Sequence, residues 1–123
     1  MGMELLQKAV MLKQQSEEVE KQLNFVSEQI DDLKRFSHGL KEISEDKEKE
    51  ILTPLGRGVY MTADKKNDKL FVEVGAGILV RKTPQEAIEI IAGQIESFNA
   101  AKIQLAAQLQ EFIQEFGRML GEV

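Results

Sequence analysis

The 123-residue sequence contains no cysteine, no tryptophan and a single histidine. The lack of cysteine excludes disulfide bonds, thiolate metal sites and cysteine nucleophiles, and it suits a reducing cytoplasm. The one histidine, His38, cannot build a histidine-rich metal site or an assembled catalytic triad. We therefore expect no metal, no cofactor and no enzymatic activity.

Long apolar runs and clustered positive charge are also missing. No stretch approaches the roughly 18 apolar residues that a membrane helix needs, and the first residues do not combine a basic region with an apolar run. The net charge is -5, whereas neutralising phosphates requires clustered lysine and arginine. The sequence predicts a soluble cytoplasmic protein that binds neither membrane nor nucleic acid.

The glycine-rich turns do not follow the patterns of phosphate-binding loops. Gly56-Arg57-Gly58 and Gly75-Ala76-Gly77 belong to neither a GxGxxG nor a GxxxxGK motif that opens a helix. The polar segment at residues 64–68 lacks the glycine and the distal glutamate of a calcium loop. We interpret all three segments as turns.

A regular heptad pattern fills the first third of the chain. Small or apolar residues alternate in steps of four and three over about five heptads, which predicts a coiled-coil helix over residues 1–48. The positions are Leu5, Ala9, Leu12, Ser16, Val19, Leu23, Val26, Ile30, Leu33, Ser37, Leu40 and Ser44.

The middle of the chain changes to strand patterns. Residues 51–82 are punctuated by proline and glycine and alternate between apolar and polar side chains, which predicts four short strands in two successive hairpins. A two-stranded ribbon is marginal in water and has unpaired edges. We therefore expect the hairpins of several subunits to share a β-barrel or sandwich.

A second heptad pattern follows over residues 84–121. Thr83, Pro84 and Glu86 have the spacing of a capping box at a helix start. The seam positions, with one polar interruption at Lys102, are Ile88, Ile91, Ile95, Phe98, Lys102, Leu105, Leu109, Phe112, Phe116 and Met119. Two such helices predict an antiparallel intrachain coiled coil, so the fold class is α+β in a single domain.

Both helices remain apolar at the end where the chain termini meet. Only part of this apolar set can face the partner helix, because several residues lie off the seams. Methionine is flexible and suits promiscuous surfaces. We expect client proteins to bind at Met1, Met3, Leu6, Val10, Met11, Ile113, Phe116, Met119 and Leu120. Packing of the final turns is the alternative, and it is favoured for seam residues such as Phe116.

The central segment resembles an alpha-class prefoldin subunit. The resemblance rests on Ile51-Leu52-Thr53-Pro54-Leu55-Gly56, on Val74-Gly75-Ala76-Gly77 and on the capped helix start at Thr83-Pro84-Gln85-Glu86. It implies a hexamer of two alpha-class and four beta-class subunits with a double β-barrel body. The strand positions that would build the barrel are Ile51, Leu52, Val59, Met61, Leu70, Val72, Val74, Ile78 and Val80. The arms are short for an alpha-class chain.

The resemblance implies an ATP-independent holdase chaperone. Its partners would be beta-class prefoldin subunits or further copies of itself, non-native client proteins, and a group II chaperonin that receives the clients. The alternative is a structural coiled-coil scaffold, filament or adaptor protein that assembles through the same hairpins.

Overall fold

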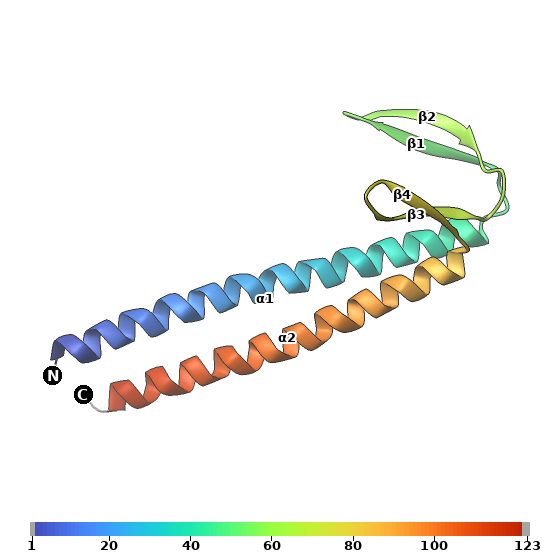
Figure 1. The fold of residues 1–123 in the computed structure, drawn as a ribbon. Coiled ribbons are helices and arrows are strands. Elements are labelled where there is room, and N and C mark those ends of the chain that lie inside the picture. The colour runs from blue at the N-terminus through green and yellow to red at the C-terminus, as the bar shows by residue number, and fades with distance from the viewer. Residues whose placement is uncertain (1, 122–123) are drawn as a thin grey trace. The chain divides into compact units, whose positions relative to one another are not determined.

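The structure, a computed structural model, describes residues 2–121. The elements follow in the order α1 (Gly2–Glu45), β1 (Glu50–Gly56), β2 (Val59–Asp64), β3 (Leu70–Gly75), β4 (Ile78–Lys82) and α2 (Pro84–Gly121) (Figure 1). This order confirms the predicted helix, two hairpins and helix, although the first helix ends at Glu45 instead of residue 48. The chain forms two compact units: unit 1 is Met1–Leu33 with Gln94–Val123, and unit 2 is Lys34–Gly93.

Unit 1 consists of two antiparallel helical segments. Residues 2–33 of α1 lie beside residues 94–121 of α2, and Gly2 and Gly121 are at the same end of the unit (Figure 1). Val19, Val26 and Ile30 are buried, and every other predicted seam position from Leu5 to Leu33 is half-buried. The heptad prediction for α1 is therefore confirmed in this unit.

The seam of α2 differs from the prediction at one position. Lys102 is exposed, and the neighbouring Ala101 is half-buried. A shift of one residue turns the side chain by about 100° around the helix. The small methyl group therefore lies nearer the seam, and the ammonium group keeps its hydration, which is expensive to remove without a partner.

Unit 2 contains the end of α1, both hairpins and the start of α2. Ala87 and Ile91 are buried on α2, and Leu40 and Ile88 are half-buried. No side chain in residues 2–121 is fully buried. The core of this unit is therefore a short continuation of the helical seam, to which the hairpins add little.

The end of α1 has no basic residue in its last turn. Lys65, from the segment between the hairpins, donates hydrogen bonds from Nζ to the carbonyl oxygens of Ile43 and Asp46, at 3.1 and 2.9 Å. These bonds satisfy carbonyl groups that the helix leaves unpaired and place a positive charge at the negative end of its dipole. Lys65 therefore links the hairpin segment to the helix end.

The start of α2 is the predicted capping box. The backbone N–H of Glu86 donates to Thr83 Oγ1 at 3.1 Å, and the hydroxyl of Thr83 donates to Glu86 Oε1 at 3.0 Å. The hydrogen bonds from Thr83, together with Lys82 at 3.7 Å, lower the pKa of Glu86. The sequence motif thus fixes where the helix begins.

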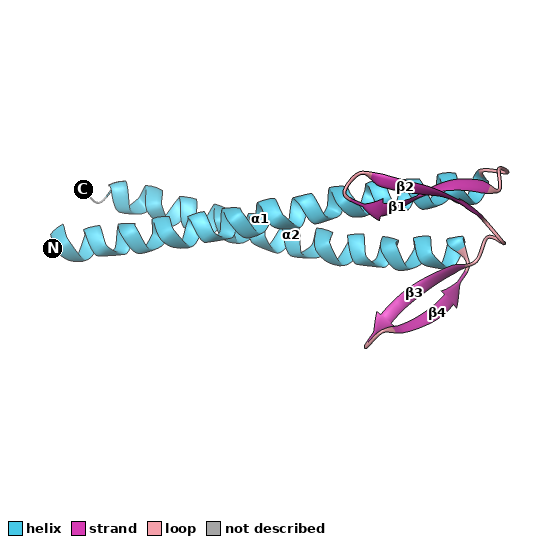
Figure 2. Cartoon of the chain, turned by 90° about the horizontal axis from the view of Figure 1, so that it is seen from above, coloured by secondary structure: helices cyan, strands magenta, loops and turns pink. Residues whose placement is uncertain are grey.

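The two hairpins are separate two-stranded antiparallel sheets, β1 with β2 and β3 with β4 (Figure 2). They have the same layout at the turn. Each first strand has a register shift one residue before its final glycine, which leaves Leu55 and Val74 without a directly paired residue. These shifts are β-bulges of the kind that bend a strand and increase its twist.

Both hairpin turns use a left-handed backbone. The central residues Arg57 and Gly58 have φ of 53° and 78°, and Ala76 and Gly77 have φ of 51° and 75°. Positive φ at both central residues is characteristic of the type I′ turn, whose twist matches that of the flanking strands. The two glycine-containing triplets are therefore hairpin turns, as predicted.

Candidate functional site

The first candidate site is the end of unit 1 where the helices begin and end. Lys8 Nζ lies 3.6 Å from Glu115 Oε1 across the helix pair, and Arg118 lies 2.8 Å from the same carboxylate. Below these ion pairs, a hollow of about 350 Å³ is lined mainly by Leu12, Phe112, Ile113 and Phe116, with Lys13 and Ser16. One ion pair, Lys8 with Glu115, therefore joins the two helices here, while part of their apolar surface stays open.

Six apolar side chains of this end are exposed, from 76% for Met3 to 48% for Val10. Met3, Leu6 and Val10 are spaced by three and four residues and therefore share a face of α1, and Ile113 and Leu120 are one heptad apart on α2. We call the set the terminal apolar surface. It comprises Met3, Leu6, Val10, Met11, Ile113 and Leu120.

Two predicted members of this surface lie elsewhere. Met119 was expected to be exposed but is buried, at 4% exposure, and Phe116 is half-buried at the hollow. Both residues belong to the α2 heptad seam, so packing against α1 covers them. Met1 lies outside the described residues.

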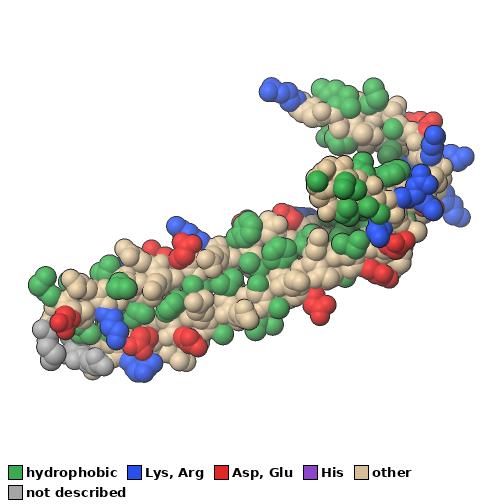
Figure 3. Space-filling view, in the orientation of Figure 1, with side chains coloured by type: hydrophobic (Ala, Val, Ile, Leu, Met, Phe, Trp, Pro, Cys, Tyr) green, Lys and Arg blue, Asp and Glu red, His purple; other side chains and the backbone are tan. Residues whose placement is uncertain are grey.

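The second candidate site is the surface of the two hairpins in unit 2. Among the predicted barrel positions, Ile51, Leu70, Val72 and Val80 are half-buried. The other five are exposed, with Leu52 at 68%: Leu52, Val59, Met61, Val74 and Ile78. Figure 3 shows hydrophobic side chains on the surface of the hairpins as well as along the helices.

The strand register assigns these residues to faces. Paired residues lie on the same face of a sheet, so Leu70, Val72 and Val80 share one face of the second hairpin, while Phe71, Leu79 and Arg81 share the other. The guanidinium of Arg81 lies over the ring of Phe71, 5.4 Å from its centre. Large apolar groups therefore lie on both faces of this ribbon.

Sequence reasoning missed several exposed apolar residues of the hairpins. Leu55, Tyr60, Phe71 and Leu79 are exposed to about the same extent as the predicted residues. The signal was available, because strands that are apolar at successive positions are typical of sheets covered on both sides. The prediction treated each strand as a simple alternation of apolar and polar residues, and it therefore left these apolar residues out.

No cluster of potential metal ligands is found in residues 2–121. No group of three His, Cys, Asp or Glu side chains there could hold a metal ion, and no helix among the described residues is long and apolar enough to span a membrane. His38 lies on the surface, 3.1 Å from Glu42 one helical turn away. The lowered pKa of Glu86 arises in the helix cap and not in a pocket.

Comparisons with known proteins agree with this architecture. A family model described as prefoldin subunit matches residues 12–121. Prefoldin subunit alpha of Methanococcoides burtonii is 33% identical over 114 residues, which cover 91% of this chain and 80% of the relative. Prefoldin subunit alpha of Methanosarcina barkeri is 30% identical over 107 residues, which cover 83% of this chain and 74% of the relative.

A solved structure has the same fold. A chain of the cryo-EM structure of filamentous PFD from Methanocaldococcus jannaschii matches with a TM-score of 0.81 and 21% sequence identity. The match covers 95% of this chain and 98% of that chain.

Proposed function

Because this chain belongs to the prefoldin family, we propose that it is a subunit of an ATP-independent holdase chaperone. In this proposal, the terminal apolar surface binds unfolded or nascent proteins, which then pass to a group II chaperonin. The observation that carries the proposal is the exposure of six apolar side chains at the end of a helix pair whose seam is filled.

The chemistry of the surface suits varied clients. Two of its members are methionines, whose flexible thioether side chains adapt to irregular apolar partners. A single surface of this size binds weakly, and several copies acting on one unfolded chain gain avidity. Holdase activity therefore requires an assembly.

The hairpins are the proposed means of assembly. Their unpaired strand edges and two-sided apolar surface support burial in an inter-subunit β-barrel. The partners in this proposal are beta-class prefoldin subunits in a hetero-hexamer, or further copies of this chain, in the cytoplasm.

A self-assembling scaffold or filament is the second candidate function. It is supported by the structural likeness to a chain of filamentous PFD, which concerns the fold alone at 21% identity. Native mass spectrometry of the chain, alone and with a beta-class subunit, separates the two. A closed hexamer with the beta-class subunit favours the chaperone, and open-ended growth of the chain alone favours the scaffold.

Suppression of aggregation tests the chaperone function. The assembled protein should slow light scattering by a chemically denatured model protein after dilution, without nucleotide. We expect substitution of Met3, Leu6, Ile113 and Leu120 by serine to remove most of this effect, because it removes the apolar area that clients contact.

Substitution of Phe25 and Ile103 by serine provides the matched control. These residues are also exposed and apolar, Ile103 at 71%, but they lie in the middle of the helices. The control should keep full activity, and both variants should keep the native oligomer mass. If the wild-type assembly does not slow aggregation, or if both variants lose activity equally, the proposed site is wrong.

A further inference from the structure

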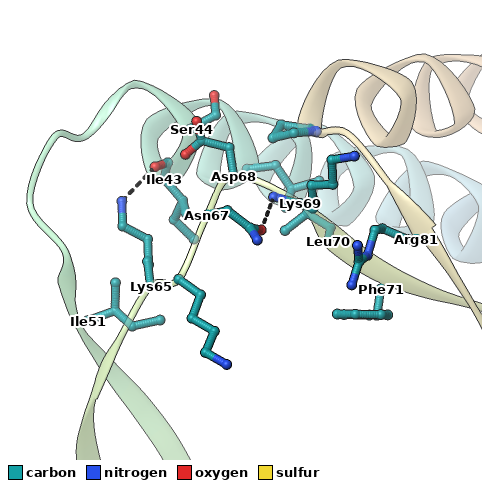
Figure 4. A pocket seen from close by; sticks show the side chains of 13 residues that line it. Ile43, Ser44, Ile51, Lys65, Asn67, Asp68, Lys69, Leu70, Phe71 and Arg81 are labelled. Carbon is teal, nitrogen blue, oxygen red and sulfur yellow. Dashed lines mark hydrogen bonds between the residues drawn. The ribbon is translucent and has the colours of Figure 1, made fainter.

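Unit 2 contains a hollow whose lining includes two of the predicted barrel positions, Ile51 and Leu70, together with residues to which the proposed function gives no role. It has a volume of about 510 Å³ and lies among the end of α1, the start of β1, residues 65–69, and the base of the second hairpin (Figure 4). This volume is within the range of small-ligand pockets, about 300–1,000 Å³. We call it the basal hollow.

Apolar side chains form about half of the lining of the basal hollow. Ile43 of α1, Ile51 of β1, and Leu70 and Phe71 of β3 contribute to it. Phe71 is exposed and is placed beside Arg81 (Figure 4). The hollow can therefore accept a large apolar side chain.

The charged residues of the lining are mainly basic. The lining contains four basic residues, Lys65, Lys66, Lys69 and Arg81, and one acidic residue, Asp68. The whole chain, in contrast, has a net charge of -5. Lys65, Lys66 and Asp68 also line a neighbouring hollow, where Glu45, Asp46 and Glu48 accompany Lys47 and Lys49. The excess of positive charge is therefore a property of the residues that line the basal hollow and not of the neighbouring one.

These basic side chains differ in whether they already interact with other groups of the chain. Lys65 donates to the carbonyl oxygens at the end of α1, and Arg81 lies over Phe71. No ion pair within the described residues engages Lys66 or Lys69, although the backbone at Lys69 is held by a 2.9 Å hydrogen bond to Asn67 Oδ1. Two ammonium groups on an anchored segment are therefore available to an outside anion.

We propose that the basal hollow binds an acidic peptide segment of a partner protein that carries a large apolar side chain. The apolar side chain occupies the hollow against Phe71 and Ile43, and flanking carboxylates pair with Lys66 and Lys69. Charge complementarity favours an acidic occupant, because the charged residues of the lining are mainly basic. A peptide fits better than an inorganic anion, because the anion would leave the apolar part of the lining uncovered. A nucleic acid would need a longer run of cations.

A labelled peptide tests this proposal on the assembled full-length protein. The probe is a fluorescein-labelled hexapeptide, Asp-Glu-Phe-Leu-Asp-Glu, and its binding is followed by fluorescence anisotropy. A second peptide has Asn and Gln in place of the acids. We expect saturable binding of the acidic peptide that weakens as salt rises, and at least about tenfold weaker binding of the neutral one.

Charge-reversal variants locate the binding site. The double variant Lys66→Glu with Lys69→Glu should weaken binding of the acidic peptide at least about tenfold. The matched control, Lys21→Glu with Lys102→Glu, makes the same change in net charge at exposed positions of unit 1 and should leave the affinity within about twofold.

Other results would overturn the inference. Absence of saturable binding, equal binding of the neutral peptide, or equal losses in the two double variants would each do so. Aggregation suppression is measured on the same samples, because the basal hollow is separate from the terminal apolar surface. The Lys66 and Lys69 variant should keep that activity, so failure of either proposal is recognised independently.

Discussion

Unit 1 and unit 2 differ in how their apolar side chains are covered. In unit 1, the heptad positions of α1 and α2 cover one another, and Val19, Val26 and Ile30 are buried. In unit 2, the hairpins expose large apolar groups on both faces, such as Leu52, Tyr60 and Phe71. A coiled-coil seam completes itself within the chain, whereas a two-stranded ribbon needs another surface.

The charges of the two units differ as well. Unit 1 contains five lysines and arginines and eleven acidic residues, and unit 2 contains eleven and ten. Unit 1 therefore has a net charge of -6 and unit 2 one of +1, so all of the excess negative charge belongs to unit 1. Repulsion between solvated acidic side chains opposes the approach of other acidic surfaces to the helices of unit 1. Unit 2 is nearly neutral and can approach another protein at lower electrostatic cost.

The largest expected effect is loss of a seam side chain in unit 1. We expect Ile30→Ala to lower the free energy of unfolding by about 2–4 kcal/mol, because Ile30 is 4% exposed and its removal leaves a cavity. The control Ile103→Ala, at an exposed position, should change it by less than about 0.5 kcal/mol. Urea unfolding followed by circular dichroism measures both. Equal effects would show that the seam does not stabilise unit 1.

A charge on the hairpin surface should act on assembly instead. We expect Leu52→Glu to weaken oligomer formation at least about tenfold, because burial in an interface would leave the carboxylate unpaired. Leu6→Glu, on the terminal apolar surface, is the matched control and should keep the oligomer. Native mass spectrometry at several concentrations reads the difference. An unchanged oligomer in the Leu52 variant would contradict assembly through this surface.

The helix cap in unit 2 makes a smaller, pH-dependent contribution. We expect Thr83→Ala to cost about 1 kcal/mol at pH 7, because it removes the N-cap hydrogen bond. The pKa of Glu86 is lowered by its bonds to Thr83, so this interaction stabilises the folded state when Glu86 is ionised. Its contribution is therefore present above the ordinary pKa of a glutamate and is lost as the pH falls through the lowered pKa of Glu86. Thermal unfolding at pH 7 and pH 3 should show a smaller difference between variant and wild type at pH 3, because the bond to the Glu86 carboxylate is weakened while the N-cap bond to the backbone N–H remains.

The link between the hairpin segment and α1 should contribute about as much. Lys65→Met removes one hydrogen bond to the carbonyl of Ile43 in the last turn of α1 and one to the carbonyl of Asp46 just after it, and we expect a loss of about 1 kcal/mol. Lys66→Met is the control, since no ion pair or hydrogen bond of Lys66 is found in residues 2–121, and it should be neutral within about 0.5 kcal/mol. Chemical unfolding compares the two variants. Equal stability would show that Lys65 does not cap the helix in solution.

The smallest effects concern glycines that have opposite roles in helix and turn. Gly93 lies inside α2 with nothing within 4 Å of an added methyl group, so Gly93→Ala should stabilise by about 0.5–1 kcal/mol. Gly77→Ala should destabilise, because Gly77 has φ of 75° in a hairpin turn. Melting temperatures of both variants measure the effect, and a shift of the same sign would contradict this assignment.

The sequence by itself determined the two helical seams, the hairpin turns and the helix cap, because each depends on residues close together in the chain. The heptad spacing predicted the buried positions of α1, and Thr83-Pro84-Gln85-Glu86 predicted the start of α2. Only the tertiary structure decided that Ala101 lies nearer the seam than Lys102, and that Met119, predicted both as a seam position and as a client-binding residue, is buried in the seam. These outcomes depend on how α1 packs against α2, which periodicity does not specify to a single residue.

The surfaces of unit 2 also required the tertiary structure. The bond from Lys65 to the end of α1 joins residues 22 and 19 positions apart, and no local pattern predicts such a contact. The basal hollow likewise brings together α1, β1, residues 65–69 and the second hairpin. Local periodicity reports which face of an element is apolar, while packing in three dimensions decides which of those faces remain open to a partner.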